Sequence, residues 1–84
     1  MNYTIQIERS AQKQLAKIPG PYFETITEKI LSLEKNPRPP GCKKLTGRES
    51  WRIRVGDYRI IYNISDRLLQ ILVIDIGNRK DIYR

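Results

Sequence analysis

Histidine is absent from this 84-residue sequence, and cysteine occurs only once, as Cys42. Because zinc and most transition-metal sites need several histidine or cysteine ligands, the sequence predicts no metal site. A single thiol cannot form an internal disulfide, and without a histidine as partner base Cys42 is expected to be a packed residue and not a nucleophile. No motif indicates another cofactor. We therefore expect a protein that works with neither metal nor cofactor.

Long apolar stretches are also missing. No run approaches the roughly 18 apolar residues that a membrane-spanning helix needs. The first eight residues lack the basic and then apolar layout of a secretory signal. A chain of this length supports one hydrophobic core, so residues 1–84 are expected to form a single domain. The sequence thus predicts a cytoplasmic protein without membrane contact.

Acidic side chains are few and are outnumbered by basic ones, above all in the second part of the chain. The whole sequence has 16 lysines and arginines against 9 acidic residues, which gives a net charge of +7. Residues 1–35 contain five basic and four acidic side chains, whereas residues 36–84 contain eleven and five. Such a basic half is typical of a protein that binds a polyanion, either nucleic acid or an acidic protein. A basic surface that serves only solubility is the alternative.

The stretch 50–62 alternates apolar and polar side chains, as half-buried strands do. Gly56-Asp57 in its middle predicts a two-residue hairpin turn of type II′. That turn places Arg54 opposite Arg59 and puts Arg52 on the same face. Because like charges directly opposite each other destabilise a sheet, the fold alone does not explain this arrangement, whereas a bound anion does. We take these three residues, called the arginine face below, as the candidate functional surface.

The rest of the chain predicts further strands and two helices. A helix capped by Ser10 is followed by a break at residues 19–21 and a second helix to about Lys35, which together form an antiparallel helical hairpin. Strands are expected at 3–8, 43–46, 50–55, 58–65 and 68–75, with a proline-rich loop at 36–41. The order β-α-α-β-β-β-β predicts an α+β fold with a mainly antiparallel sheet, whose arginine face lies opposite the helices.

The hairpin WRIRVGDYRIIY (51–62) and the ending GNRKDIYR (77–84), in this order of elements, resemble RelE-type toxins of the RelE/ParE superfamily. The likeness covers essentially the whole chain and implies a RelE-like microbial RNase fold. It also implies the toxin of a type II toxin–antitoxin system. Such a toxin acts as a ribosome-dependent mRNA endonuclease that enters the ribosomal A site and cleaves translated messenger RNA. Its partners would be the ribosome, mRNA and an acidic, helical RelB-like antitoxin that wraps the toxin.

The resemblance also assigns roles to individual residues. The expected catalytic residues are Arg52, Arg54, Arg59, Arg79 and Tyr83. The expected contacts to RNA and ribosome are Lys43, Lys44, Arg48, Lys80 and Arg84. This sequence departs from the family pattern in two ways: arginine stands at 52 and 54, where lysine is frequent, and Asn78 stands where many relatives have histidine.

The chemistry of these residue types agrees with cleavage of RNA by its own 2′-hydroxyl. Guanidinium groups bind phosphate in a bidentate manner and stabilise the charge that develops on it. Tyr83 is suited to stack on a base. Proton transfer is less obvious, since arginine is a poor base and Glu49 and Asp81 are the nearby carboxylates. We therefore expect activity only where the ribosome orients the substrate.

Two other functions stay open from the sequence. The ParE kind of toxin in the same superfamily inhibits DNA gyrase without RNA cleavage. A basic domain without catalytic activity that only binds RNA or its partner is the third possibility.

Overall fold

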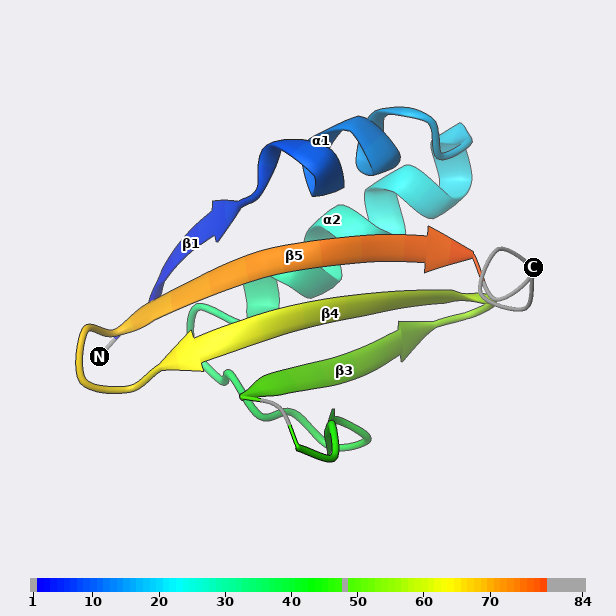
Figure 1. The fold of residues 1–84 in the computed structure, drawn as a ribbon. Helices are drawn as coiled ribbons and strands as arrows, with labels where there is room; N and C mark the ends of the chain where they lie inside the picture. Colours follow the sequence, from blue (N-terminus) through cyan, green and yellow to red (C-terminus); the bar gives the residue numbers. More distant parts are fainter. Residues whose placement is uncertain (1, 48, 79–84) are drawn as a thin grey trace.

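The computed structural model describes residues 2–47 and 49–78, which form a five-stranded sheet and two helices (Figure 1). The elements are β1 (Thr4–Ile7), α1 (Arg9–Ala16), α2 (Gly20–Ser32), β2 (Lys43–Lys44), β3 (Ser50–Val55), β4 (Tyr58–Ser65) and β5 (Gln70–Asn78). The strands lie in the order β1-β5-β4-β3-β2, with β1 parallel to β5 and the other neighbours antiparallel. The α+β fold predicted from the sequence is confirmed.

The start of α1 differs from the prediction, because Ser10 does not cap it. The helix begins at Arg9, and Glu8 occupies the cap position without a side-chain hydrogen bond. The backbone N–H of Glu8 still donates to the carbonyl of Val73 at 2.9 Å, as a continuation of the strand pairing. Its own carbonyl already accepts from Gln12 at 2.8 Å. Glu8 is thus both the end of the strand pairing and the cap of the helix, and Ser10 lies inside the helix.

The end of α2 comes at Ser32, earlier than the predicted Lys35. The N–H groups of Leu33, Glu34 and Lys35 donate to carbonyls three residues back instead of four. Such a tightened last turn is common where a helix ends. At its other end α2 begins at Gly20, inside the break expected at 19–21, and Pro21 is the second residue of the helix and not the first.

The last strand is displaced toward the C-terminus relative to the predicted range 68–75. Leu69 has a positive φ of 53°, and Leu68 donates to the hydroxyl of Ser65, so the turn extends to residue 69. At the other end, pairing with β4 continues as far as Asn78. β2 is limited to two residues and pairs only with Arg52 and Trp51.

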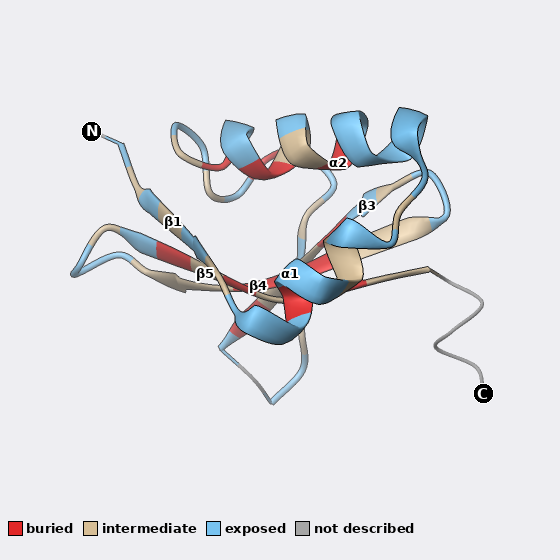
Figure 2. Ribbon diagram, turned by 90° about the horizontal axis from the view of Figure 1, so that it is seen from above, coloured by how far each residue is buried: buried red, intermediate tan, exposed pale blue. Residues whose placement is uncertain are grey.

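The core lies between the helices and one face of the sheet (Figure 2). α2 lies across that face and contributes Ile26 and Ile30, whereas α1 runs along the edge of β5 and contributes Ala11 (Figure 1). The sheet contributes the buried side chains Ile53, Ile60, Tyr62, Ile71, Val73 and Ile76. Cys42 and Trp51 are half-buried against this core, which agrees with the packing role expected for Cys42. None of the helices in 2–47 and 49–78 is long and apolar enough to cross a membrane.

Candidate functional site

The β3–β4 hairpin presents the arginine face on the side of the sheet that α2 does not cover. Gly56 has a φ of +60°, as the first central residue of a type II′ turn requires, and the turn fixes the register. Arg54 pairs with Arg59, and Arg52 pairs with Ile61. Because the alternate residues point into the core, the three arginines point away from it. The sequence-derived register of this hairpin is therefore observed.

A β-bulge in β5 brings a carboxylate to the same face. Tyr62 pairs with Val73, but the residue before it in β4, Ile61, pairs with Asp75, so Ile74 is the extra residue. In a regular strand Val73 and Asp75 would point to the same side, into the core. The extra residue turns Asp75 to the arginine side, which is a known use of bulges.

Asp75 holds Arg59 from one side. Its Oδ2 lies 3.1 Å from the Nη2 of Arg59, and both side chains are partly exposed, at 29% for Arg59 and 31% for Asp75. Its Oδ1 accepts a hydrogen bond of 3.0 Å from the side-chain amide of Gln14 in α1. Gln14 in turn accepts from the backbone N–H of Ile76 at 2.9 Å. Arg59 is thus part of a chain of polar contacts that ends on the backbone of β5.

Arg52 and Arg54 also line a pocket with two lysines, at the edge of β3 that pairs with β2. The pocket has a volume of about 280 Å³ and is lined by Lys29, Pro40, Gly41, Lys43, Arg52, Ile53 and Arg54. Its four cations come from α2, β2 and β3. Within the described parts of the chain, none of the four forms an ion pair. We call this the basic pocket; its charge is suited to an anion such as a phosphate.

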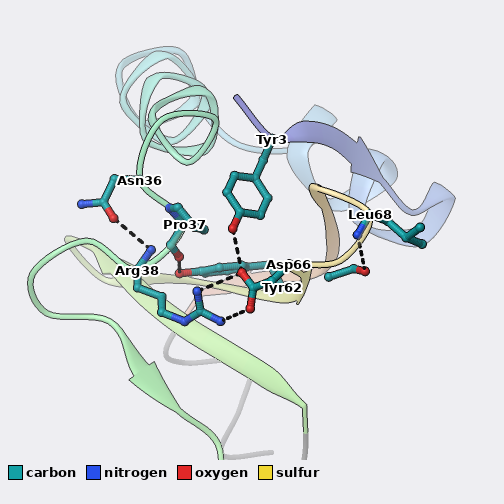
Figure 3. A network of polar contacts seen from close by, with 8 residues as sticks. Tyr3, Asn36, Pro37, Arg38, Tyr62, Asp66 and Leu68 are labelled. Atoms are coloured by element: carbon teal, nitrogen blue, oxygen red, sulfur yellow. Dashed lines mark hydrogen bonds and ion pairs between the residues drawn. The ribbon is translucent and has the colours of Figure 1, made fainter. Parts of the chain in front are cut away.

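The loop 36–41 forms one wall of this pocket, and a cluster of polar contacts holds its first part against the sheet (Figure 3). Both terminal nitrogens of Arg38 donate to the carboxylate of Asp66, at 3.1 and 2.9 Å, and the hydroxyl of Tyr3 donates to it at 2.6 Å. Hydrogen bonds from Arg38 and Tyr3 hold the pKa of Asp66 at about 2. The guanidinium carbon of Arg38 also lies 4.9 Å from the ring centre of Trp51. The hydroxyl of Tyr62 donates to the carbonyl of Pro37 at 2.7 Å.

The two lysines of β2 do not share one face. Lys43 pairs with Arg52 and belongs to the arginine side, whereas Lys44 pairs with Trp51 and belongs to the opposite side. Glu49 is exposed and lines a shallow depression with Lys44, apart from the arginines. The remaining predicted site residues lie outside the described residues: Arg48, Arg79, Lys80, Tyr83 and Arg84.

Three residues of this region were missed by the sequence reasoning: Gln14, Lys29 and Asp75. Asp75 carried a usable signal, because it is the one charged residue in the otherwise apolar stretch 71–76. Gln14 and Lys29 lie on helix faces that look like ordinary solvated surface. Only the packing of the helices brings them to the sheet.

A family model described as "ParE toxin of type II toxin-antitoxin system, parDE" matches residues 5–83. The chain belongs to this family. Its membership confirms the RelE/ParE resemblance seen in the sequence, and the protein is a toxin of a type II toxin–antitoxin system.

Individual relatives agree in length and fold. Toxin RelG of Mycobacterium tuberculosis is 28% identical over 88 residues, which cover 100% of this chain and 99% of that protein. The mRNA interferase toxin RelE of Escherichia coli is 24% identical over 88 residues, covering 95% and 86%. The toxin is also similar to a chain in the archaeal RelE–RelB complex from Pyrococcus horikoshii, with a TM-score of 0.84 and 28% identity over 94% of this chain and 97% of that one.

Proposed function

We propose that this toxin is an mRNA interferase that cleaves translated messenger RNA in the ribosomal A site and so inhibits translation. The observation that supports it best is the cluster of Arg52, Arg54 and Lys43 on one side of the sheet, next to Arg59. Lys43 and Arg52 lie directly opposite each other, and neither forms an ion pair within the described residues. Like charges in such a pair destabilise a sheet, and a bound polyanion would relieve this repulsion. The name of the relative from Escherichia coli, mRNA interferase toxin RelE, supports RNA as that polyanion.

The proposed reaction is attack of the ribose 2′-oxygen on the adjacent phosphorus. It breaks the bond from phosphorus to the 5′-oxygen of the next nucleotide and leaves a 2′,3′-cyclic phosphate; the 2′-hydroxyl loses its proton and the leaving 5′-oxygen gains one. Arg52 and Arg54 would bind the backbone at the basic pocket, and Arg59 would donate to the scissile phosphate as its charge increases. Removal of one such donor typically costs about 10²- to 10³-fold in rate. Arg79 is proposed as a donor to the leaving oxygen and Tyr83 as a stacking platform for a base.

Proton transfer limits this site when it acts alone. The sequence has no histidine, and arginine does not lose its proton at physiological pH. Alignment of the 2′-hydroxyl with the leaving oxygen by the ribosome would supply much of the rate through orientation. We therefore expect the toxin to cleave free RNA only slowly and mRNA on translating ribosomes efficiently.

The proposed natural inhibitor is a RelB-like antitoxin. The Pyrococcus horikoshii structure is a complex of RelE with RelB, which supports a partner of this type. The net charge of +7 and the arginine face suit an acidic helical segment, because opposite charges steer association and favour the complex.

Induced expression followed by mapping of messenger 5′ ends tests the function. For the wild type we expect new ends at a fixed position within translated codons, and for Arg59→Ala we expect their loss. Asp57→Asn, which changes an exposed turn residue near Arg59, serves as the control and should cleave like the wild type. Growth arrest with intact messages would refute the proposal.

A second candidate is inhibition of DNA gyrase without RNA cleavage, and the ParE description of the matching family model favours it. Arg79→Ala separates the two functions. Growth arrest should disappear if the toxin is a nuclease that uses this residue, and should largely persist if the toxin binds gyrase. DNA damage in cells with intact messages would support gyrase as the target.

A further inference from the structure

Arg59 is the arginine of the arginine face that forms an ion pair, and its guanidinium is partly buried. Its Nε atom is buried without a hydrogen-bond partner, and its Nη2 donates to Asp75. A guanidinium has five N–H donors. With Nε enclosed and one Nη2 contact made, the remaining donors lie on the outer part of the group, which is partly exposed.

Asp75 is itself fixed by two neighbours. One carboxylate oxygen accepts from Arg59 and the other from Gln14. Gln14 cannot rotate its amide without losing the hydrogen bond from Ile76. The orientation of the Arg59 guanidinium thus depends on a helix residue that never approaches the arginine directly.

We infer that Asp75, held by Gln14, is a positioning residue that orients Arg59 toward the scissile phosphate. This inference rests on the proposed nuclease function. Asp75 pairs with only one nitrogen of Arg59, so it directs the group without occupying all of its donors. It also offsets the repulsion between Arg59 and Arg54, which lie directly opposite each other.

Positioning is the favoured role because a free arginine would adopt many rotamers on an open sheet. Fixing it before the substrate binds removes that entropy cost from the reaction. Electrostatic stabilisation is strongest when the donors do not have to reorganise as the charge develops. A carboxylate that only blocked the site would have no need for the second hydrogen bond from Gln14.

The donor and acceptor pattern allows a sharp test. In Asp75→Asn, the oxygen can still accept from Arg59, but the new amide then faces the amide of Gln14, donor against donor. In the double variant Asp75→Asn with Gln14→Glu, the carboxylate at 14 accepts from both Asn Nδ2 and the N–H of Ile76. The double variant therefore restores every hydrogen bond of the chain.

The measurement is cleavage of mRNA on programmed ribosomes with purified toxin variants. Asp75→Asn should lower kcat about 10- to 100-fold with little change in KM, since ribosome affinity comes from the other cations. The double variant should recover to within a few-fold of the wild type. Asp57→Asn, the loss of an exposed carboxylate, should change neither constant.

Several results would overturn the inference. A single variant with wild-type kcat would show that Asp75 does not position Arg59, and a faster one would show that it competes with RNA. A double variant as slow as the single one would show that the hydrogen-bond chain is irrelevant.

A wild-type protein that does not cleave mRNA would refute the proposed function. The orientation of Arg59 by Asp75 can then still be tested by a second measurement, which does not depend on cleavage. The Arg59 Nε–H signal in NMR spectra should exchange slowly in the wild type, rapidly in Asp75→Asn and slowly again in the double variant. Equal exchange in all three proteins would refute the positioning role.

Discussion

Removal of the hydroxyl group of Tyr62 tests whether the loop beside the basic pocket is fixed by the core. The Tyr62 side chain is completely buried, and its hydroxyl donates to the carbonyl of Pro37 at 2.7 Å. The same loop continues to Pro40 and Gly41 in the pocket wall. Tyr62→Phe keeps the ring and its packing, so the variant removes only the contacts of the hydroxyl, to the carbonyl of Pro37 and to Cys42.

The expected loss of stability depends on how far the hydroxyl and its acceptor are buried. A neutral hydrogen bond contributes about 0.5–1.5 kcal/mol, and an abandoned buried acceptor costs about 1–3 kcal/mol. Because Pro37 is only half-buried, water can reach its carbonyl in part, and we expect about 1.5 kcal/mol of lost stability. For a domain of this size that corresponds to a decrease in Tm of about 6–12 °C.

Urea unfolding followed by the fluorescence of Trp51, the only tryptophan, measures this loss. The midpoint should fall with an unchanged slope, because the surface exposed on unfolding is the same. Tyr58→Phe is the matched control; Tyr58 is half-buried, and its ring centre lies 5.5 Å from that of Tyr22 in a tilted arrangement. The loss of stability in Tyr58→Phe should stay within about 0.5 kcal/mol. A Tyr62→Phe midpoint equal to that of the control would refute the reasoning.

The same residue predicts an alkaline effect. Burial raises the pKa of the Tyr62 phenol above its ordinary value of about 10. The unfolded chain therefore releases this proton first, and the stability of the wild type should fall as pH rises above about 10. Unfolding midpoints of Tyr62→Phe should lack that part of the decrease.

Three further predictions concern other elements. Arg38 holds the pKa of Asp66 at about 2, so this carboxylate stabilises the fold above about pH 4 and loses that effect as the pH falls toward 2. The stability of Asp66→Asn should therefore fall less steeply than that of the wild type between about pH 4 and about pH 2. Equal stability curves for the two proteins would contradict this. Gly56→Ala, at a φ of +60°, should cost about 1–2 kcal/mol in thermal unfolding, whereas Gly20→Ala at the start of α2 should be neutral or stabilising. Lys29→Ala should weaken RNA binding and reduce the slope of log K against log salt by about 1, and an unchanged slope would exclude Lys29 from phosphate contact.

The β3–β4 hairpin was predictable because its information is local. The Gly56-Asp57 pair determines the turn, the turn determines the register, and the alternation of side chains determines the faces. The arginine face follows from these three facts without any knowledge of the remaining chain. The boundaries of α1 and β5 were less predictable, since Glu8 and Leu69 take conformations that depend on pairing with other strands.

The sequence by itself determined the order of elements, the position of the arginines and the family, because each of these depends on residues close together in the chain. The tertiary structure alone decided what Arg59 contacts. Regular alternation along β5 would place Asp75 in the core. Only the bulge opposite Ile61 turns its side chain to the arginine side. Gln14 reaches Asp75 because β1 covers only the first part of β5 and leaves the rest of that edge to α1. Contacts between residues 61 positions apart depend on packing, which no local pattern encodes.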